Sequence, residues 1–214
     1  MMKSSLFITG TDTNVGKTVL SALLIAALDA IYWKPVQSGA CEGTDRQTVM
    51  RLAGVSEGKT RAECYCFDPP VSPHLAAREA GVKIEFSVIQ RPQDTDQARL
   101  IVEGAGGILT PLNESQTMLD LICHLGLPVV VAARTSLGTI NHTLLTLAAL
   151  RQAGAVSDGV VMLGDENAGN RRAIEHYGNT PVIGHVPWLR SLDRESLLDV
   201  FASRFQQTYF RQLT

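Results

Sequence analysis

The stretch Gly10-Thr11-Asp12-Thr13-Asn14-Val15-Gly16-Lys17-Thr18 decides the fold that we expect for this chain. A short apolar run at 6–8 precedes it and predicts a buried strand. A longer apolar run at 19–28 follows it and predicts a helix. A strand, a glycine-bounded loop that ends in Gly-Lys-Thr, and a helix are together typical of a phosphate-binding loop.

Each residue type in this loop suits phosphate chemistry. Gly16 has no Cβ and lets the backbone approach a phosphate closely, and the first amides of the helix have no intrahelical partner. Lys17 can reach the β- and γ-phosphates, and the Thr18 hydroxyl can bind Mg²⁺. Five residues separate the two glycines, where a general phosphate loop has four. The alternative is a glycine-rich strand-to-helix turn that arises by chance.

Length and composition favour one globular domain that covers residues 1–214. Hydrophobic residues make up 45% and charged residues 19% of the chain, as in folded proteins. The net charge of −2 gives no sign of nucleic-acid binding or of attraction to an acidic membrane. The first residues lead directly into the first strand, and no apolar run could cross a bilayer. We therefore expect a cytoplasmic protein without a targeting signal.

The four cysteines are Cys41, Cys64, Cys66 and Cys123. The close pair Cys64 and Cys66 could indicate a metal site, but neither a second pair nor a nearby histidine cluster completes a ligand set. Residues i and i+2 lie on one face of a strand. We therefore expect buried, reduced thiols at this pair.

Predicted strands and helices alternate along the rest of the chain. Further strands are predicted at 31–36, 63–67, 99–103, 128–133, 159–163 and 181–186. Further helices are predicted at 46–53, 75–80, 84–90, 118–125, 139–152, 171–176 and from 194 towards 210, the last capped by Asp193. Several strands are continuous apolar runs, which indicates a sheet covered on both faces. The predicted class is an α/β, three-layer fold like that of P-loop NTPases, with a mainly parallel sheet of about seven strands and helices on both faces.

Two charged residues stand at the ends of predicted strands, where parallel sheets place their ligands. Glu103 ends an apolar strand and is placed to bind Mg²⁺, directly or through water; the alternative is a capping or solvated carboxylate. A buried Lys34 needs an anionic partner, and a second cation beside Lys17 suits a transferred phosphoryl group. The alternative for Lys34 is an edge-strand lysine that keeps the sheet soluble. The glycine-rich stretch 104–107 is predicted as a loop at the same edge.

Two other candidates are less distinctive. Asp45 is a second acidic candidate for the metal, but as the N-cap of helix 46–53 it needs no metal. The stretch 136–142 leads into the N-terminus of a long helix, which is a place for a small carboxylate. The alternative is an ordinary capped turn, and His142 is predicted to form structural hydrogen bonds rather than to act as a base.

Several motifs together resemble the dethiobiotin synthetase family. They stand in the family's order, span most of the chain, and include the five-residue spacing inside the loop. The matching motifs are Gly-Thr-Asp-Thr-Asn-Val-Gly-Lys-Thr (10–18), Lys-Pro-Val-Gln-Ser-Gly (34–39), Ser-Pro-His (72–74), Val-Glu-Gly-Ala-Gly-Gly (102–107), Leu-Gly-Thr-Ile-Asn-His (137–142) and Val-Pro-Trp-Leu (186–189).

The resemblance implies a ligase that converts 7,8-diaminononanoate (7,8-diaminopelargonate), CO₂ and ATP to dethiobiotin, ADP and phosphate through a carbamate and a carbamic–phosphoric anhydride. It implies Mg²⁺ on Thr18, Asp45 and Glu103, with catalytic roles for Lys17, Lys34 and Thr13. The implied nucleotide contacts are Asn14, Val15, Gly16, Lys17, Thr18, Val19, Asp45, Glu103, Gly104, Ala105, Gly106, Leu163, Gly164, Pro187, Trp188 and Leu189.

The resemblance also implies a homodimer whose site lies at the subunit interface. Thr13 and Ser38 would hold the carbamate or the diamine. Leu137, Gly138 and Asn141 of one subunit would receive the substrate carboxylate bound to the other. One departure concerns the base, because Leu163 and Gly164 stand where the family often carries an adenine-reading Asn followed by Asp.

Two rival classes share the phosphate loop. Partition and septum-positioning ATPases of the MinD type are switch proteins, but they carry a lysine directly after the first loop glycine, where this chain has Thr11. The synthetase-like domain of a cobyrinate amidase is the second rival, but no glutaminase domain follows in this sequence.

Overall fold

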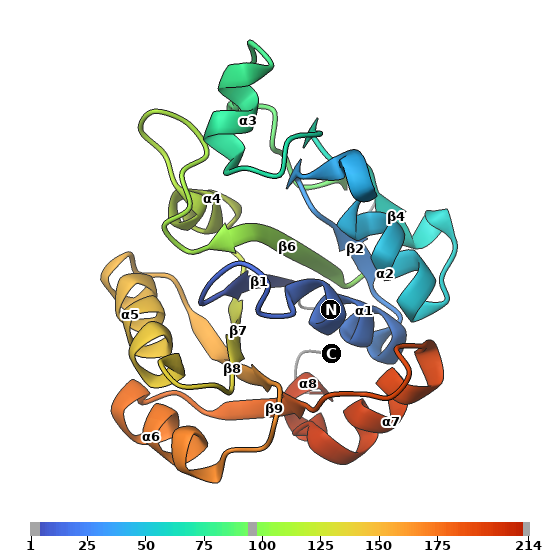
Figure 1. Cartoon of the computed structure of the whole chain (residues 1–214), viewed down its shortest axis with the longest axis vertical. Helices are drawn as coiled ribbons and strands as arrows, with labels where there is room; N and C mark the ends of the chain where they lie inside the picture. The colour runs from blue at the N-terminus through green and yellow to red at the C-terminus, as the bar shows by residue number, and fades with distance from the viewer. Residues whose placement is uncertain (1–4, 94–97, 212–214) are drawn as a thin grey trace.

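The computed structural model describes residues 5–93 and 98–211 and contains a seven-stranded sheet in the order β4-β2-β6-β1-β7-β8-β9 (Figure 1). Every neighbouring pair in this sheet is parallel. The strands are β1 (Leu6–Gly10), β2 (Ile31–Trp33), β4 (Thr60–Arg61), β6 (Leu100–Gly107), β7 (Val129–Arg134), β8 (Ser157–Leu163) and β9 (Val182–Val186). The expected lead-in from the N-terminus falls on residues 1–4, outside the described part.

Helices cover both faces of the sheet, which confirms the predicted three-layer class (Figure 1). One layer holds α1 (Lys17–Leu28), α2 (Asp45–Ala53) and α7 (Arg194–Arg204). The other holds α4 (Met118–Leu125), α5 (Thr139–Gln152) and α6 (Ala168–Gly178). A two-stranded sheet of β3 (Val36–Ser38) and β5 (Tyr65–Phe67) contacts α3 (Pro73–Glu79), and α8 (Gln207–Arg211) comes last.

The central strand β1 explains why two layers are needed. Its side chains alternate between the faces of the sheet, and Leu6, Phe7 and Ile8 are all fully buried. Phe7 joins the apolar cluster under α4, α5 and α6, while Leu6 and Ile8 join the cluster under α1, α2 and α7. A continuous apolar run therefore becomes a strand buried on both faces, with the phosphate loop at its carboxyl end.

The prediction of a single strand at 31–36 is wrong, because two separate strands occupy this stretch. The chain leaves the main sheet after Trp33, and Val36–Ser38 instead pairs with β5 in the small sheet. Pro35 has no N–H to donate to a ladder, so it separates the two strands. The predicted strand at 63–67 is accordingly shorter, at Tyr65–Phe67, and the two-residue edge strand Thr60–Arg61 was not predicted.

The predicted helix at 84–90 is also wrong, because turns and extended chain occupy this stretch. Its buried apolar residues are Ile84, Phe86 and Ile89. Their spacing of two and then three residues does not form a helical stripe, which needs steps of three and four. These side chains instead anchor an irregular segment to the large core cluster.

Two predicted boundaries also differ from the structure. The stretch 104–107 is the end of β6 rather than a loop, and Gly10 pairs with Gly107 there. The C-terminal helix stops at Arg204, because Phe205 is extended and bridges to Gly184 in β9. A Cβ on Gly184 would lie 2.6 Å from the Phe205 ring, so the glycine makes room for this crossing.

The cysteine prediction is partly wrong. The four thiols are free, as expected, but Cys66 is exposed and Cys64 is only half-buried. Cys64 precedes β5, so the two residues do not share a buried strand face. Across the described residues, no helix combines the length and apolar character needed to span a bilayer.

Candidate active site

The phosphate loop presents an uncapped helix N-terminus. Gly16, the N-cap of α1, has a left-handed φ of 95°, and neither a side-chain cap nor an acidic residue occupies the first turn. Asn14 is also left-handed, with φ 56°. The first amides of α1 are therefore available to an anion. The positive φ favours glycine here, and a Cβ on Gly16 would also lie 2.6 Å from a methyl group at the tip of the Leu163 side chain.

Lys17 is a buried cation that, within residues 5–93 and 98–211, has a single neutral hydrogen-bond partner. Its side chain folds back over the loop and its Nζ donates to the Asp12 carbonyl at 3.0 Å. Burial lowers the pKa of Lys17 to about 8, and attraction to Glu103 offsets only part of this effect. A phosphate group beside Nζ would provide the missing negative charge.

Lys34, Asp45, Glu103 and Thr18 form one cluster at the ends of β2 and β6 and the start of α1. The Lys34 Nζ bonds to Asp45 Oδ2 and lies 3.3 Å from Glu103 Oε1. Thr18 Oγ1 lies 2.9 Å from Asp45 Oδ1 and 3.0 Å from Glu103 Oε1. Lys34 is 5% and Glu103 1% exposed, so the pairing is shielded from water. β2 lies inside the sheet, which removes the edge-strand interpretation of Lys34.

The N-cap prediction for Asp45 is wrong, and the correction explains its position in the cluster. Thr44 caps α2 through a capping box with Gln47, and Asp45 is the first helical residue. The Asp45 carboxylate is therefore released from capping and points at Thr18 and Lys34. A cap one residue earlier thus allows the second acid to join the cluster.

The cluster shifts the pKa values of its members. Burial alone would lower the pKa of Lys34, but attraction and hydrogen bonds from Glu103 and Asp45 outweigh it and raise that pKa. Burial likewise opposes the charge of Asp45, but Lys34 more than compensates and holds its pKa below the usual value. Both residues therefore stay charged at neutral pH.

The donor set of this cluster fits a magnesium ion. Thr18, Asp45 and Glu103 provide hard oxygen atoms, which Mg²⁺ prefers. The Thr18 hydroxyl has a single proton, so it can donate to only one of the two carboxylates that contact it. In the described residues no group of three or more His, Cys, Asp or Glu side chains is arranged so that it could hold a metal ion by itself. Sites of this kind do not need such a group, because substrate phosphates and water complete the shell.

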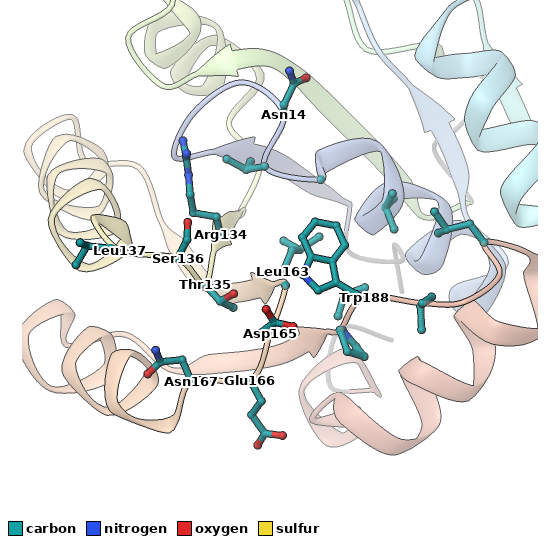
Figure 2. A pocket seen from close by; sticks show the side chains of 18 residues that line it. Asn14, Arg134, Thr135, Ser136, Leu137, Leu163, Asp165, Glu166, Asn167 and Trp188 are labelled. Atoms are coloured by element: carbon teal, nitrogen blue, oxygen red, sulfur yellow. The ribbon is translucent and has the colours of Figure 1, made fainter.

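A cavity of about 500 Å³ adjoins the phosphate loop (Figure 2). It brings together ten residues predicted from the sequence, from the loop, the end of β8, the segment after β9 and the turn before α5. They are Asn14, Val15, Gly16, Val19, Leu137, Leu163, Gly164, Pro187, Trp188 and Leu189. Figure 2 shows Trp188 beside Leu163 at its centre. The cavity therefore offers an apolar wall next to an anion-binding helix end.

Other predicted residues lie outside this cavity. Gly104 and Ala105 are buried within β6, and a Cβ on Gly104 would lie 3.0 Å from Phe7. Gly106, at the partly buried end of the same strand, has φ 64°. Thr13 is exposed and its amide donates to Asp12 at 2.7 Å. The remaining predicted residues are Ser38 at the end of β3, Gly138 before α5 and Asn141 in its first turn.

Sequence reasoning missed several residues around the cavity. Arg134 at the end of β7 pairs with Asp12 of the phosphate loop, and Figure 2 shows its side chain extending towards that loop. The turn at 165–167 after β8 also lines the cavity. Both follow strand ends, so the strand-end rule could have found them.

The order of the strands, the geometry of the phosphate loop and the cluster around Glu103 together define a phosphate-loop nucleotide-binding protein. The profile of a family described as AAA domain matches residues 4–196. Among solved structures, a ParA family ATPase from Chlorobium tepidum has a TM-score of 0.55 at 12% identity, over 98% of this chain and 97% of that one. A MinC:MinD cell division protein complex from Aquifex aeolicus has a TM-score of 0.57 at 10% identity, over 98% of this chain and 95% of the matched chain. These likenesses show the fold alone.

Sequence relatives are much more similar. The ATP-dependent dethiobiotin synthetase BioD of Rhodopseudomonas palustris (strain BisB5) is 46% identical over 100% of both chains. Those of Nitrobacter hamburgensis and Agrobacterium fabrum are each 45% identical, over 95% and 96% of both chains. The chain belongs to the dethiobiotin synthetase family, which confirms the resemblance. The rival partition ATPases share its fold and little of its sequence.

Proposed function

We propose that this chain uses ATP to make dethiobiotin from 7,8-diaminononanoate and CO₂, in a site assembled around Lys17, Lys34 and Glu103. The observation that carries this proposal is the cluster of Lys34, Asp45, Glu103 and Thr18 at the start of α1, the helix that begins with the buried Lys17 and whose preceding loop adjoins a cavity of about 500 Å³. Phosphoryl transfer depends mainly on positioning and charge neutralisation, and these groups can provide both.

The proposed reaction has three steps. An amine of the substrate adds to CO₂ and releases a proton, which gives a carbamate. A carbamate oxygen attacks the γ-phosphorus, and the bond to ADP breaks. The second amine attacks the carbamoyl carbon, expels phosphate and loses a proton, which closes the cyclic urea. This last step is intramolecular and gains from fixed proximity.

The chain's own groups have distinct roles in this scheme. The α1 amides after Gly16 bind the phosphates, and Lys17 neutralises the transferred group. Lys34 lies at the carboxylate cluster, where its charge can pair with the carbamate or the phosphoryl oxygens. Thr13 and Ser38 hold the carbamate or diamine. Magnesium, when held by Thr18, Asp45 and Glu103, would neutralise the nucleotide phosphates.

Isotope transfer tests this function directly. Incubation with diaminononanoate, ¹³C-bicarbonate, Mg²⁺ and ATP should give dethiobiotin that carries one ¹³C, detected by mass spectrometry. Phosphate release should require both the diamine and bicarbonate. Release that ignores the diamine and responds to DNA or lipid vesicles would instead indicate a switch ATPase.

The metal role of Glu103 can be tested by Glu103→Gln, which keeps the shape of the side chain and removes its charge. The variant should need roughly tenfold or more additional Mg²⁺ for half-maximal activity, because a ligand or its close support is lost. Glu195→Gln, in the first turn of α7, is the matched control. If Glu103→Gln and wild type share one Mg²⁺ titration curve, Glu103 does not act on the metal.

The base pocket predicts weak nucleotide discrimination. Leu163 packs over Gly16 and offers no hydrogen bond to a base. Sites that merely lack a polar partner discriminate weakly, whereas sites built to pair with a base reject the wrong one. GTP or CTP should therefore support turnover within roughly tenfold of ATP, about 1.4 kcal/mol. Leu163→Asn should increase the preference for ATP. A wild-type preference of several hundredfold would show that backbone groups or the 165–167 turn read adenine.

A homodimer would complete the substrate site. A groove of about 460 Å³ beside the phosphate loop is lined by Thr11, Leu109 and Leu145, among others. Leu109 and Leu145 are more than half exposed and Leu137 is fully exposed, although such side chains favour burial. The α5 N-terminus has no side-chain cap and no acid in its first turn, which suits a substrate carboxylate from the partner's site. We place the enzyme in the cytoplasm, whose reducing conditions suit its exposed free thiols.

A further inference from the structure

Two buried hydroxyl groups from different elements contact the same oxygen of Glu103. Ser21 lies in α1, one turn after Thr18, and its Oγ donates to Glu103 Oε2 at 2.6 Å. Tyr32 lies in β2, and its Oη donates to the same oxygen at 3.1 Å. Both side chains have no exposed surface. The proposed function assigns no role to either residue.

Because of these bonds, the two oxygens of the Glu103 carboxylate have different sets of partners. Oε2 accepts both hydroxyl protons, while Oε1 faces Thr18 at 3.0 Å and Lys34 at 3.3 Å. Each hydroxyl has one proton to donate. A half-turn of the carboxylate would only exchange two equivalent oxygens, but a tilt that brought both oxygens towards the cluster would break both hydroxyl bonds. The two hydroxyls therefore favour an orientation in which a single oxygen faces the proposed metal site.

We propose that Ser21 and Tyr32 are positioning residues that make Glu103 present only Oε1 to the magnesium ion; this rests on the proposed function. The alternative is that the hydroxyls simply satisfy a buried carboxylate. That need could be met by donors on either oxygen, whereas here donors from two separate elements converge on one. Single-oxygen coordination suits the compact octahedral shell of Mg²⁺, while Ca²⁺ accepts two oxygens of one carboxylate.

The test compares two metals rather than two rates. Mg²⁺ and Ca²⁺ binding to the full chain, saturated with a non-hydrolysable ATP analogue, is measured by calorimetry for wild type and for Ser21→Ala/Tyr32→Phe. Loss of outer-shell partners typically costs 10- to 100-fold in metal affinity, so Mg²⁺ affinity should fall by roughly tenfold. Ca²⁺ affinity should fall less, because a released carboxylate can bind it with both oxygens. The ratio of Ca²⁺ to Mg²⁺ affinity should therefore rise severalfold.

Controls separate positioning from general damage. Tyr65→Phe removes a hydroxyl that accepts a bond from the Glu85 amide outside the cluster, and it should leave both affinities unchanged. Tyr32→Phe alone is the second variant if the double variant fails to fold, with a smaller shift in the same direction. Equal loss of affinity for both metals, or Mg²⁺ affinity within twofold of wild type, would overturn the proposal.

This test does not depend on the diamine. If wild type binds Mg²⁺ through Glu103 and the ratio shifts as expected, the positioning role stands even if no dethiobiotin forms. If Glu103→Gln leaves Mg²⁺ affinity unchanged, no metal is bound at this carboxylate and the proposal fails. The two hypotheses can therefore fail separately.

Discussion

Lys17→Ala should lower turnover by on the order of 10²-fold or more, which corresponds to about 2.7 kcal/mol or more of transition-state stabilisation. Lys17 is 7% exposed, and among the described residues its Nζ donates one hydrogen bond, to the Asp12 carbonyl. Burial has lowered its pKa to about 8, so a phosphoryl group would be its first strong partner. The negative charge that develops during transfer should strengthen that pairing further.

The measurement is diamine-dependent phosphate release at saturating ATP, with circular dichroism to check the fold. Lys59→Ala is the matched control, because Lys59 pairs with Asp29 at the surface, away from the phosphate loop. It should change the rate little, since exposed ion pairs contribute about 0–1 kcal/mol. A Lys17→Ala variant that folds and turns over like wild type would remove the phosphate-loop assignment.

Local features of the fold were predictable from the sequence. The structure confirms α4 at Met118–Leu125 and α5 at Thr139–Gln152 with the predicted boundaries. Gly126 directly follows α4, Gly138 directly precedes α5, and apolar residues recur along both helices. The phosphate loop was equally readable, because strand, glycines and helix are neighbours in the chain. In these three cases the contacts that define the element lie between neighbours in the chain, so the sequence pattern was enough to predict it.

Features that depend on distant contacts were not predictable. The Thr44-x-x-Gln47 capping box of α2 is a local signal that the sequence carries, but the contact between Asp45 and Lys34 joins separate elements and is visible only in the fold. Arg134 and Asp12 are 122 positions apart, and no periodicity links them. The segment 84–90 is shaped by the core that it covers rather than by its own preferences. Tertiary contacts therefore decided each of these cases.

Two inactive variants should restore activity when mixed if the site is shared between subunits. The proposed site takes its phosphate loop from one subunit and the start of α5 from the other. Gly138 is a poor position for a substitution, because its φ of 93° strains any side chain. Asn141→Asp is better: Asn141 is exposed in the first turn of α5, and an acid there favours the helix. The new charge would repel the substrate carboxylate, so the variant should be inactive but folded.

A mixed dimer of Lys17→Ala and Asn141→Asp contains one site built from two undamaged halves. The intact phosphate loop comes from the Asn141→Asp subunit, and the intact α5 start comes from the Lys17→Ala subunit. If half of the dimers are mixed, activity should return to roughly a quarter of wild type. Chains with distinguishable labels would report subunit exchange in the same sample. Complete exchange without recovered activity would mean that each subunit builds its substrate site alone, and that the exposed leucines serve another contact.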